Sequence, residues 1–218
     1  MCSLVHRLTY VALPVLLAAS VLASPGAQAH PFAETEYSLR TAFKVSDEGL
    51  VAFVVLEIPI PVVMKGIGVT KEDDLATKKR KVERYNQSIW SDLADGLTLT
   101  VDGEPVKGEW MAIEHELNGK AAEGFFVYMV GYALQDADAL ASRDGYTVSV
   151  RNTGWSTVPM WYSGSAVALA PWQVDASTAR DVLGDEKSKR KLTDPDRWTR
   201  DDQMRHLVVT VSRPKDSP

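Results

Sequence analysis

Cysteine is almost absent from this sequence, and its absence limits the chemistry open to the chain. The single cysteine among 218 residues is Cys2. From residue 30 onward there is none, which excludes a disulfide framework, thiolate metal ligands and a cysteine nucleophile in that part. Histidine is also scarce, because only His30, His115 and His206 follow His6. Any metal site must therefore be built from few imidazoles, together with carboxylates or a free amine.

Long apolar runs are scarce as well. The longest covers residues 11–23 and is too short to span a bilayer comfortably. Arg7 precedes it, and Ala27-Gln28-Ala29 places small residues where a signal peptidase cuts. These features predict that residues 1–29 are a cleaved signal peptide. We therefore expect a periplasmic or secreted protein with no transmembrane segment after cleavage.

The chain has no basic excess. Its formal net charge is −5, and residues 30–218 carry −6 because the first 29 residues contain one arginine and no acidic residue. This mild acidity argues against non-specific binding to nucleic acid or to an anionic membrane surface. The length from residue 30 onward suits one domain over residues 30–213, with 214–218 as a tail.

Alternating and apolar patterns predict strands. Residues 33–45 alternate, with Arg40 and its neighbours of the same parity on a solvent face, and residues 50–58 are nearly continuously apolar. The turn residues 46–49 join them into a hairpin. Asp102-Gly103 predicts a second hairpin, in which residues 97–101 pair with 106–111. Further strands are expected at 123–134, 146–150, 158–169 and 205–213.

Two helices are expected among these strands. The longer covers about residues 70–95, with Thr70 as its cap, the basic residues 78–81 facing solvent, and a buried stripe at helical spacing formed by Leu75, Val82, Tyr85, Ile89 and Leu93. The shorter runs from Ser177 to Leu183, inside a C-terminal extension of about residues 172–213. The sequence thus predicts a mainly β fold: an antiparallel, immunoglobulin-like β-sandwich with one long inserted helix and a short C-terminal helix.

His30 is the main candidate metal ligand. Cleavage after Ala29 would leave it with both a free α-amine and an imidazole, which can bind one ion together. Pro31 has no amide N–H, so binding modes that need a deprotonated amide there are excluded. A second imidazole would complete a three-nitrogen, T-shaped set that suits copper. We predict His115 as that ligand, against the alternative of a half-buried, hydrogen-bonded histidine; His206 is equally compatible with a surface position.

No sequence pattern points to an enzyme. There is no Ser/His/Asp order, no glycine-rich phosphate loop and no Cys/His spacing. The aromatic stretch 155–162 contains Trp161 and Tyr162, which alternate and cannot both face inward on a regular strand. Core packing is the ordinary role of such residues. The alternative role is a docking face for a partner protein.

In outline the chain resembles a known family. The shared features are the His30-Pro31 start, a strand hairpin, a helix that ends near Leu93, the segment Leu97–Val106 with its Asp-Gly turn, and a later strand leading into an aromatic segment. Over most of residues 30–170 this layout resembles the periplasmic domains of unknown function encoded beside bacterial nickel/cobalt exporters. It equally resembles the exported front halves of HupE/UreJ-type permeases. The His-Pro start is also similar to that of CopC-type copper-binding sandwiches.

The resemblance implies periplasmic metal handling without an established reaction. Those exporter-associated domains typically start His-Pro-His, whereas Phe32 stands at the third position here, so only His30 carries over. We therefore expect a copper or nickel/cobalt ion as ligand, and a membrane metal transporter or another periplasmic protein as partner. The alternatives are a structural or interaction module without metal, and a copper mono-oxygenase with a histidine brace, which would also need a flat aromatic surface.

Overall fold

The computed structural model describes residues 36–118, 124–135, 137–183 and 195–214. It contains two β-sheets, with strand orders β10-β8-β1-β2-β6-β5 and β4-β3-β7-β11-β9. The six-stranded sheet consists of β1 (Tyr37–Ser46), β2 (Gly49–Pro59), β5 (Gly108–Asn118), β6 (Phe125–Leu134), β8 (Met160–Ala168) and β10 (Asp181–Leu183). The five-stranded sheet consists of β3 (Leu97–Val101), β4 (Glu104–Pro105), β7 (Gly145–Asn152), β9 (Gln173–Ser177) and β11 (His206–Ser212).

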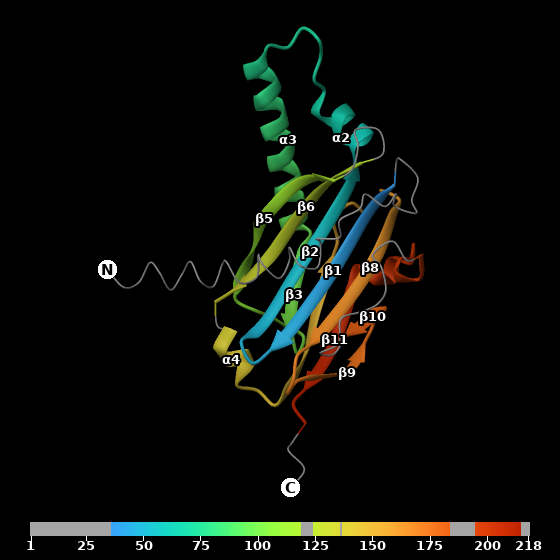
Figure 1. Cartoon of the computed structure of the whole chain (residues 1–218). Helices are drawn as coiled ribbons and strands as arrows, with labels where there is room; N and C mark the ends of the chain where they lie inside the picture. Colours follow the sequence, from blue (N-terminus) through green and yellow to red (C-terminus); the bar gives the residue numbers. More distant parts are fainter. Residues whose placement is uncertain (1–35, 119–123, 136, 184–194, 215–218) are drawn as a thin grey trace, which may run out of the picture.

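The two sheets stack face to face with the hydrophobic core between them (Figure 1). Alternate residues of each strand point inward, so one buried cluster joins both sheets. It includes Leu39, Phe43 and Leu56 from one sheet and Val148 and Leu207 from the other. The predicted β-sandwich is confirmed. Most strand pairs are antiparallel, but β8 runs parallel to both β1 and β10, so the larger sheet is mixed.

Both predicted hairpins form, although the second is shorter than expected. β1 and β2 pair antiparallel from Ser38↔Glu57 to Ser46↔Gly49. Asp102 and Gly103 have φ angles of 53° and 85°, as the tight turn between β3 and β4 requires. The expected return strand at residues 106–111 is wrong: only Glu104–Pro105 pairs with β3, and β5 then pairs with β6 in the other sheet.

The inserted helical segment differs from the prediction at its start. An extra helix, α2 (Ile60–Ile67), follows β2 directly, with Pro61 in its first turn, where a missing N–H costs nothing. The long helix α3 covers Leu75–Asp95, with Asp74 as its N-cap instead of Thr70. The Asp74 carboxylate accepts the Thr77 N–H at 2.7 Å. Leu75, predicted to be buried, is 73% exposed because it lies in the first turn, beyond the sheets.

The remaining helices are short. Between β6 and β7 lies the one-turn helix α4 (Ala137–Ala141). The predicted helix at 177–183 is wrong, because this segment instead forms the end of β9 and the strand β10. Its backbone groups bond to two otherwise open edges, β11 and β8. Two 3₁₀ turns follow, η1 (Pro195–Arg197) and η2 (Asp202–Arg205).

None of the helices in the described ranges is both long and apolar enough to cross a membrane.

Candidate functional site

His115, the predicted second ligand, lies on β5 at the edge of the six-stranded sheet. Its side chain is exposed, and its ring stacks beside Tyr128 with 6.4 Å between ring centroids. The Trp90 ring of α3 meets the same imidazole edge-on at 6.2 Å. Glu114 and Glu116 flank His115 along β5 and pair with the residues of β6 on either side of Tyr128. Because side chains alternate along a strand, both glutamates lie on the opposite face of the sheet from His115. His115 is therefore one accessible imidazole in an aromatic setting.

His206 lies at the start of β11, opposite Arg151 of β7. Partial burial lowers the pKa of His206, and the nearby positive charge of Arg151 lowers it further. Both effects disfavour the imidazolium, so His206 is mainly neutral at neutral pH. A neutral imidazole is the form that binds metals.

His115 and His206 are too far apart to share one ion. Five residues form a row across the six-stranded sheet: His115, Tyr128, Leu56, Leu39 and Tyr162. This row places β5 four strand spacings, about 19 Å, from β8. η2, which leads directly into His206, packs against β8. In the described part of the chain, no three His, Asp, Glu or Cys side chains are grouped to hold a metal. His30 lies outside the described residues.

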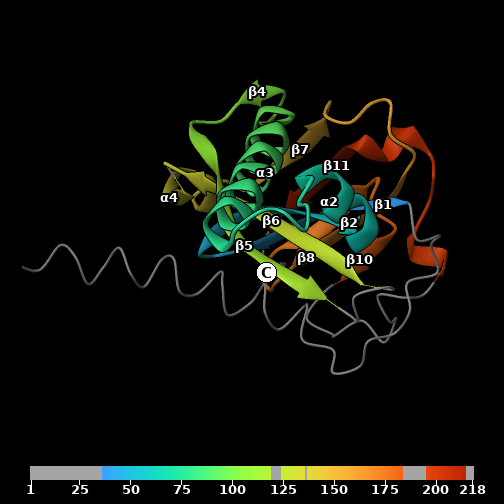
Figure 2. The same ribbon diagram turned by 90° about the horizontal axis from the view of Figure 1, so that it is seen from above.

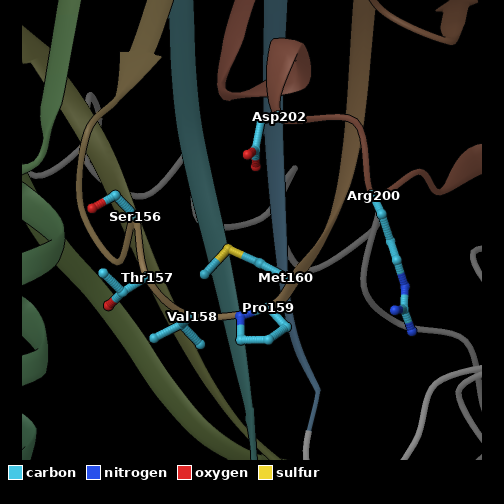
Figure 3. A pocket seen from close by; sticks show the side chains of 7 residues that line it. All are labelled: Ser156, Thr157, Val158, Pro159, Met160, Arg200 and Asp202. Carbon is cyan, nitrogen blue, oxygen red and sulfur yellow. The ribbon is translucent and has the colours of Figure 1, made fainter.

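A hollow lies at the end of the sandwich where β1 begins. Its volume is about 290 Å³, and it is lined by the β7–β8 connection and the segment before η2: Ser156, Thr157, Val158, Pro159, Met160, Arg200 and Asp202. Figure 3 shows the first five side chains along one wall, with Arg200 and Asp202 coming from the other segment. The hollow thus has an apolar floor and two opposite charges at its rim.

Neighbouring groups already engage both charges. Arg200 forms an ion pair with Glu36 and lies 4.6 Å from the centre of the Trp161 ring. Asp202 accepts a hydrogen bond from the Tyr162 hydroxyl at 3.1 Å. No histidine lines the hollow beside Ser156, and Asp202 is its only carboxylate.

The aromatic stretch is mostly part of the structure's interior. Tyr162 is buried between the sheets, while Trp161 is half-buried on the outer face and donates its Nε1–H to Glu36 at 2.7 Å. All six tryptophans of the chain are described, and none is exposed. The described residues therefore form no flat, exposed tryptophan surface of the kind that a polysaccharide-binding mono-oxygenase would use.

A buried charged cluster covers the outer face of β1 and β2, and on β1 the sequence predicted a solvent face there. Arg40 is only 3% exposed, so the prediction of a solvent face is wrong at this position. Glu57, which belongs to the apolar run of residues 50–58, is only 4% exposed. Asp181 and Arg197 are buried nearby and joined by a 2.5 Å ion pair. The ring of Trp198 lies 5.4 Å from the guanidinium carbon of Arg40. The C-terminal segment thus covers this face and removes it from water.

Arg40 is the least satisfied member of this cluster. Its Nε and Nη1 atoms have no hydrogen-bond partner among the described residues. Burial lowers the pKa of Arg40, whereas the charge of Glu57 acts against that effect. Ser38 donates a 2.5 Å hydrogen bond to Glu57. A glutamate within an otherwise apolar run, as at position 57, was the one sequence signal for a buried charge here.

Comparison with known proteins leaves the chain without a family assignment: no protein-family model matches it, and no curated protein shows significant similarity to it.

Proposed function

We propose that this protein is an exported β-sandwich domain that binds a divalent transition metal through His30 and assists metal delivery or export. The position of the first residue of β1 supports this proposal. Tyr37, its first residue, pairs with Met160 of the hollow. His30 is therefore joined through a short connection to the end of the sandwich that also contains Asp202 and the start of β11.

The donor set on the described residues is incomplete by itself. Neither His115 nor His206 belongs to a group of three possible ligands among the described residues, so the proposed site draws on the amine and imidazole of His30. An extended chain of seven residues spans at most about 25 Å, and this brings His30 within reach of either histidine. The neutral imidazole of His206 suits copper, as does the accessible ring of His115.

Copper titration of two chains tests the proposal: one that begins at His30 and one that carries an additional N-terminal alanine. The added residue moves the free amine away from the imidazole and abolishes their shared chelate. We expect at least a tenfold loss of copper affinity, measured by isothermal titration calorimetry. Equal affinity in both chains would show that His30 does not bind the metal in this way.

Two further variants identify the third ligand. His115→Ala and His206→Ala are introduced separately into the chain that begins at His30. The variant that removes a ligand lowers copper affinity and reduces the number of nitrogen couplings in the electron paramagnetic resonance spectrum. The other variant serves as its control, because the separation between β5 and β8 prevents both histidines from binding one ion.

A further inference from the structure

α2 and the first half of α3 form a hairpin that rises beyond the ends of the strands (Figure 1). We define the basic hairpin as residues 60–84. The fully buried side chains of α3 are Asn86, Ile89 and Leu93, and in its first eleven residues only the half-buried Val82 and Tyr85 pack against the core. Ile60, Val63 and Ile67 of α2 are buried and anchor the base of the basic hairpin, and the remainder of the hairpin projects beyond the sheets.

The projection is rigid despite its exposure. Tyr85 packs so closely on Gly66 that a β-carbon there would lie 2.4 Å from its ring, and burial raises the pKa of Tyr85 to about 12. The Lys81 ammonium donates to the Gly68 carbonyl at 2.9 Å and to Asp73 at 2.7 Å. These contacts hold the two helices together, so the charges are displayed in a fixed arrangement.

Charge is strongly segregated between this projection and the sandwich. The basic hairpin contains seven basic and four acidic residues, an excess of three positive charges. Because residues 30–218 carry −6 in total, the rest of that stretch carries −9. The net charge of the whole chain argued against an anionic surface as partner. The local distribution differs, because the basic hairpin is positive and the sandwich is negative, and this separation of charge would turn the hairpin toward an anionic surface.

Most of the positive charges have no counter-ion among the described residues. The ion pairs found there engage Lys81 of the hairpin but not Lys65, Lys78, Lys79, Arg80 or Arg84. Of the acidic residues, Asp73 pairs with Lys81, and Asp74 accepts the Thr77 N–H. Glu72 is also hydrogen-bonded, to Thr70, so structural contacts occupy three of the four acids and leave most of the cations available.

Apolar side chains accompany these cations. Leu75 is 73% exposed and Met64 is 49% exposed, which makes them two of the five large exposed hydrophobic residues in the described part of the chain. Lys78, Lys79 and Arg80 are consecutive and point in different directions around the helix axis, whereas Lys81 is held by Gly68 and Asp73. A convex projection with cations on several sides and two apolar side chains does not match a rigid protein groove. It matches a planar, fluid array of headgroups that can rearrange around it.

We propose that the basic hairpin docks the protein on a bilayer that contains anionic phospholipids. The cations attract the lipid phosphates, Leu75 and Met64 enter the headgroup region, and the acidic sandwich is held away from the surface. This docking is independent of metal binding, because the hairpin contains no histidine. The competing partner for such a surface is an acidic protein, and the test below distinguishes the two.

Vesicle co-sedimentation tests the proposal with the chain that begins at His30. The vesicles contain either phosphatidylcholine alone or phosphatidylcholine with 30% phosphatidylglycerol, in 50 mM and 150 mM NaCl. We expect binding to the anionic vesicles alone, weaker at the higher salt. Lys79→Gln, Arg80→Gln and Arg84→Gln together should reduce the partition coefficient at least thirtyfold. Leu75→Ser with Met64→Ser should reduce it severalfold at the higher salt, where the apolar contribution dominates.

The matched control removes three cations from the sandwich instead: Lys44→Gln, Lys107→Gln and Arg151→Gln. Its net charge equals that of the hairpin variant, and its partition coefficient should stay within threefold of the unmodified chain. Circular dichroism confirms that all variants are folded. No binding to anionic vesicles at 50 mM NaCl, or equal losses in the two triple variants, would overturn the proposal. Soluble polyglutamate that binds the hairpin more tightly than the vesicles do would instead assign this surface to an acidic protein.

Discussion

At the scale of single residues, the charge of Glu57 favours the charged form of Arg40, whose burial lowers its pKa. An isolated buried charge is costly, and removing one member of a buried ion pair typically destabilises a protein by several kcal/mol. Glu57→Gln keeps the side chain's shape and an acceptor for Ser38 but removes the charge that opposes the desolvation of Arg40. We expect a loss of about 3 kcal/mol in the free energy of unfolding, measured in urea.

Glu116→Gln provides the control for that change. It removes the same charge from an exposed position on β5, and its effect on the free energy of unfolding should stay below about 0.5 kcal/mol. Equal effects at positions 57 and 116 would show that the cluster on the outer face contributes little to stability. A larger effect at position 57 would identify Arg40 and Glu57 as the feature that fixes the C-terminal segment against β1 and β2.

At the scale of elements, periodicity predicted α3 well only where the helix contacts the sheets. The stripe assigned from the sequence runs from Leu75 to Leu93, but burial begins at Asn86 and increases toward Leu93. Helical spacing shows which face is apolar, yet it does not show how far a helix extends beyond the layer that it covers. In the N-terminal half of α3 the helical pattern is only partly buried: Val82 and Tyr85 pack against the core, whereas Leu75 is exposed.

Separate substitutions at the two ends of this stripe, Leu75 and Leu93, measure how much each end contributes to the free energy of unfolding. Leu93 is fully buried, and Leu93→Ala should reduce the free energy of unfolding by about 3 kcal/mol through lost burial and the cavity left behind. Leu75→Ala removes the same atoms from a largely exposed position and should change it by less than about 0.5 kcal/mol. Urea denaturation measures both. A large effect of Leu75→Ala would mean that the first turn of α3 is covered in solution.

Strand positions could be predicted from the sequence more completely than strand partners. Alternation located β1, β7 and β11, and the Asp102-Gly103 turn was recognised from its composition. Partners depend on contacts between distant segments, which is why the crossing of residues 106–111 to the other sheet was missed. α2 was missed because Pro59 and Pro61 suggested only the end of a strand. The burial of Arg40 depends on Trp198, far along the chain, so local alternation placed that side chain in solvent.

The candidate site was the least predictable part for the same reason. The sequence identified each histidine but not the distance between them. The row of paired residues from His115 to Tyr162 shows that His115 and His206 lie at different places on the molecule. Such a separation follows from sheet order, which no single segment encodes. The charge segregation between the basic hairpin and the sandwich is likewise a property of the folded chain.

At the scale of the whole molecule, the two sheets share one core, and the chain passes between them repeatedly. β2 leads through α2 and α3 to β3 in the other sheet, and β4 leads back to β5. Trp172 provides a direct link: its ring meets Tyr146 of the five-stranded sheet at 5.5 Å, and its Nε1–H bonds to Asp47 in the β1–β2 turn. Separating the sheets would therefore expose both faces of the same apolar cluster.

This shared core predicts a single cooperative unfolding transition for the chain that begins at His30. Urea denaturation followed by tryptophan fluorescence and by far-ultraviolet circular dichroism should give coincident curves, because neither sheet can retain its inner face without the other. Trp172→Phe should shift both curves to lower urea by the same amount, since Trp172 contacts both sheets. Curves with separate midpoints, or a Trp172→Phe shift seen by only one probe, would show that the two sheets unfold as independent units.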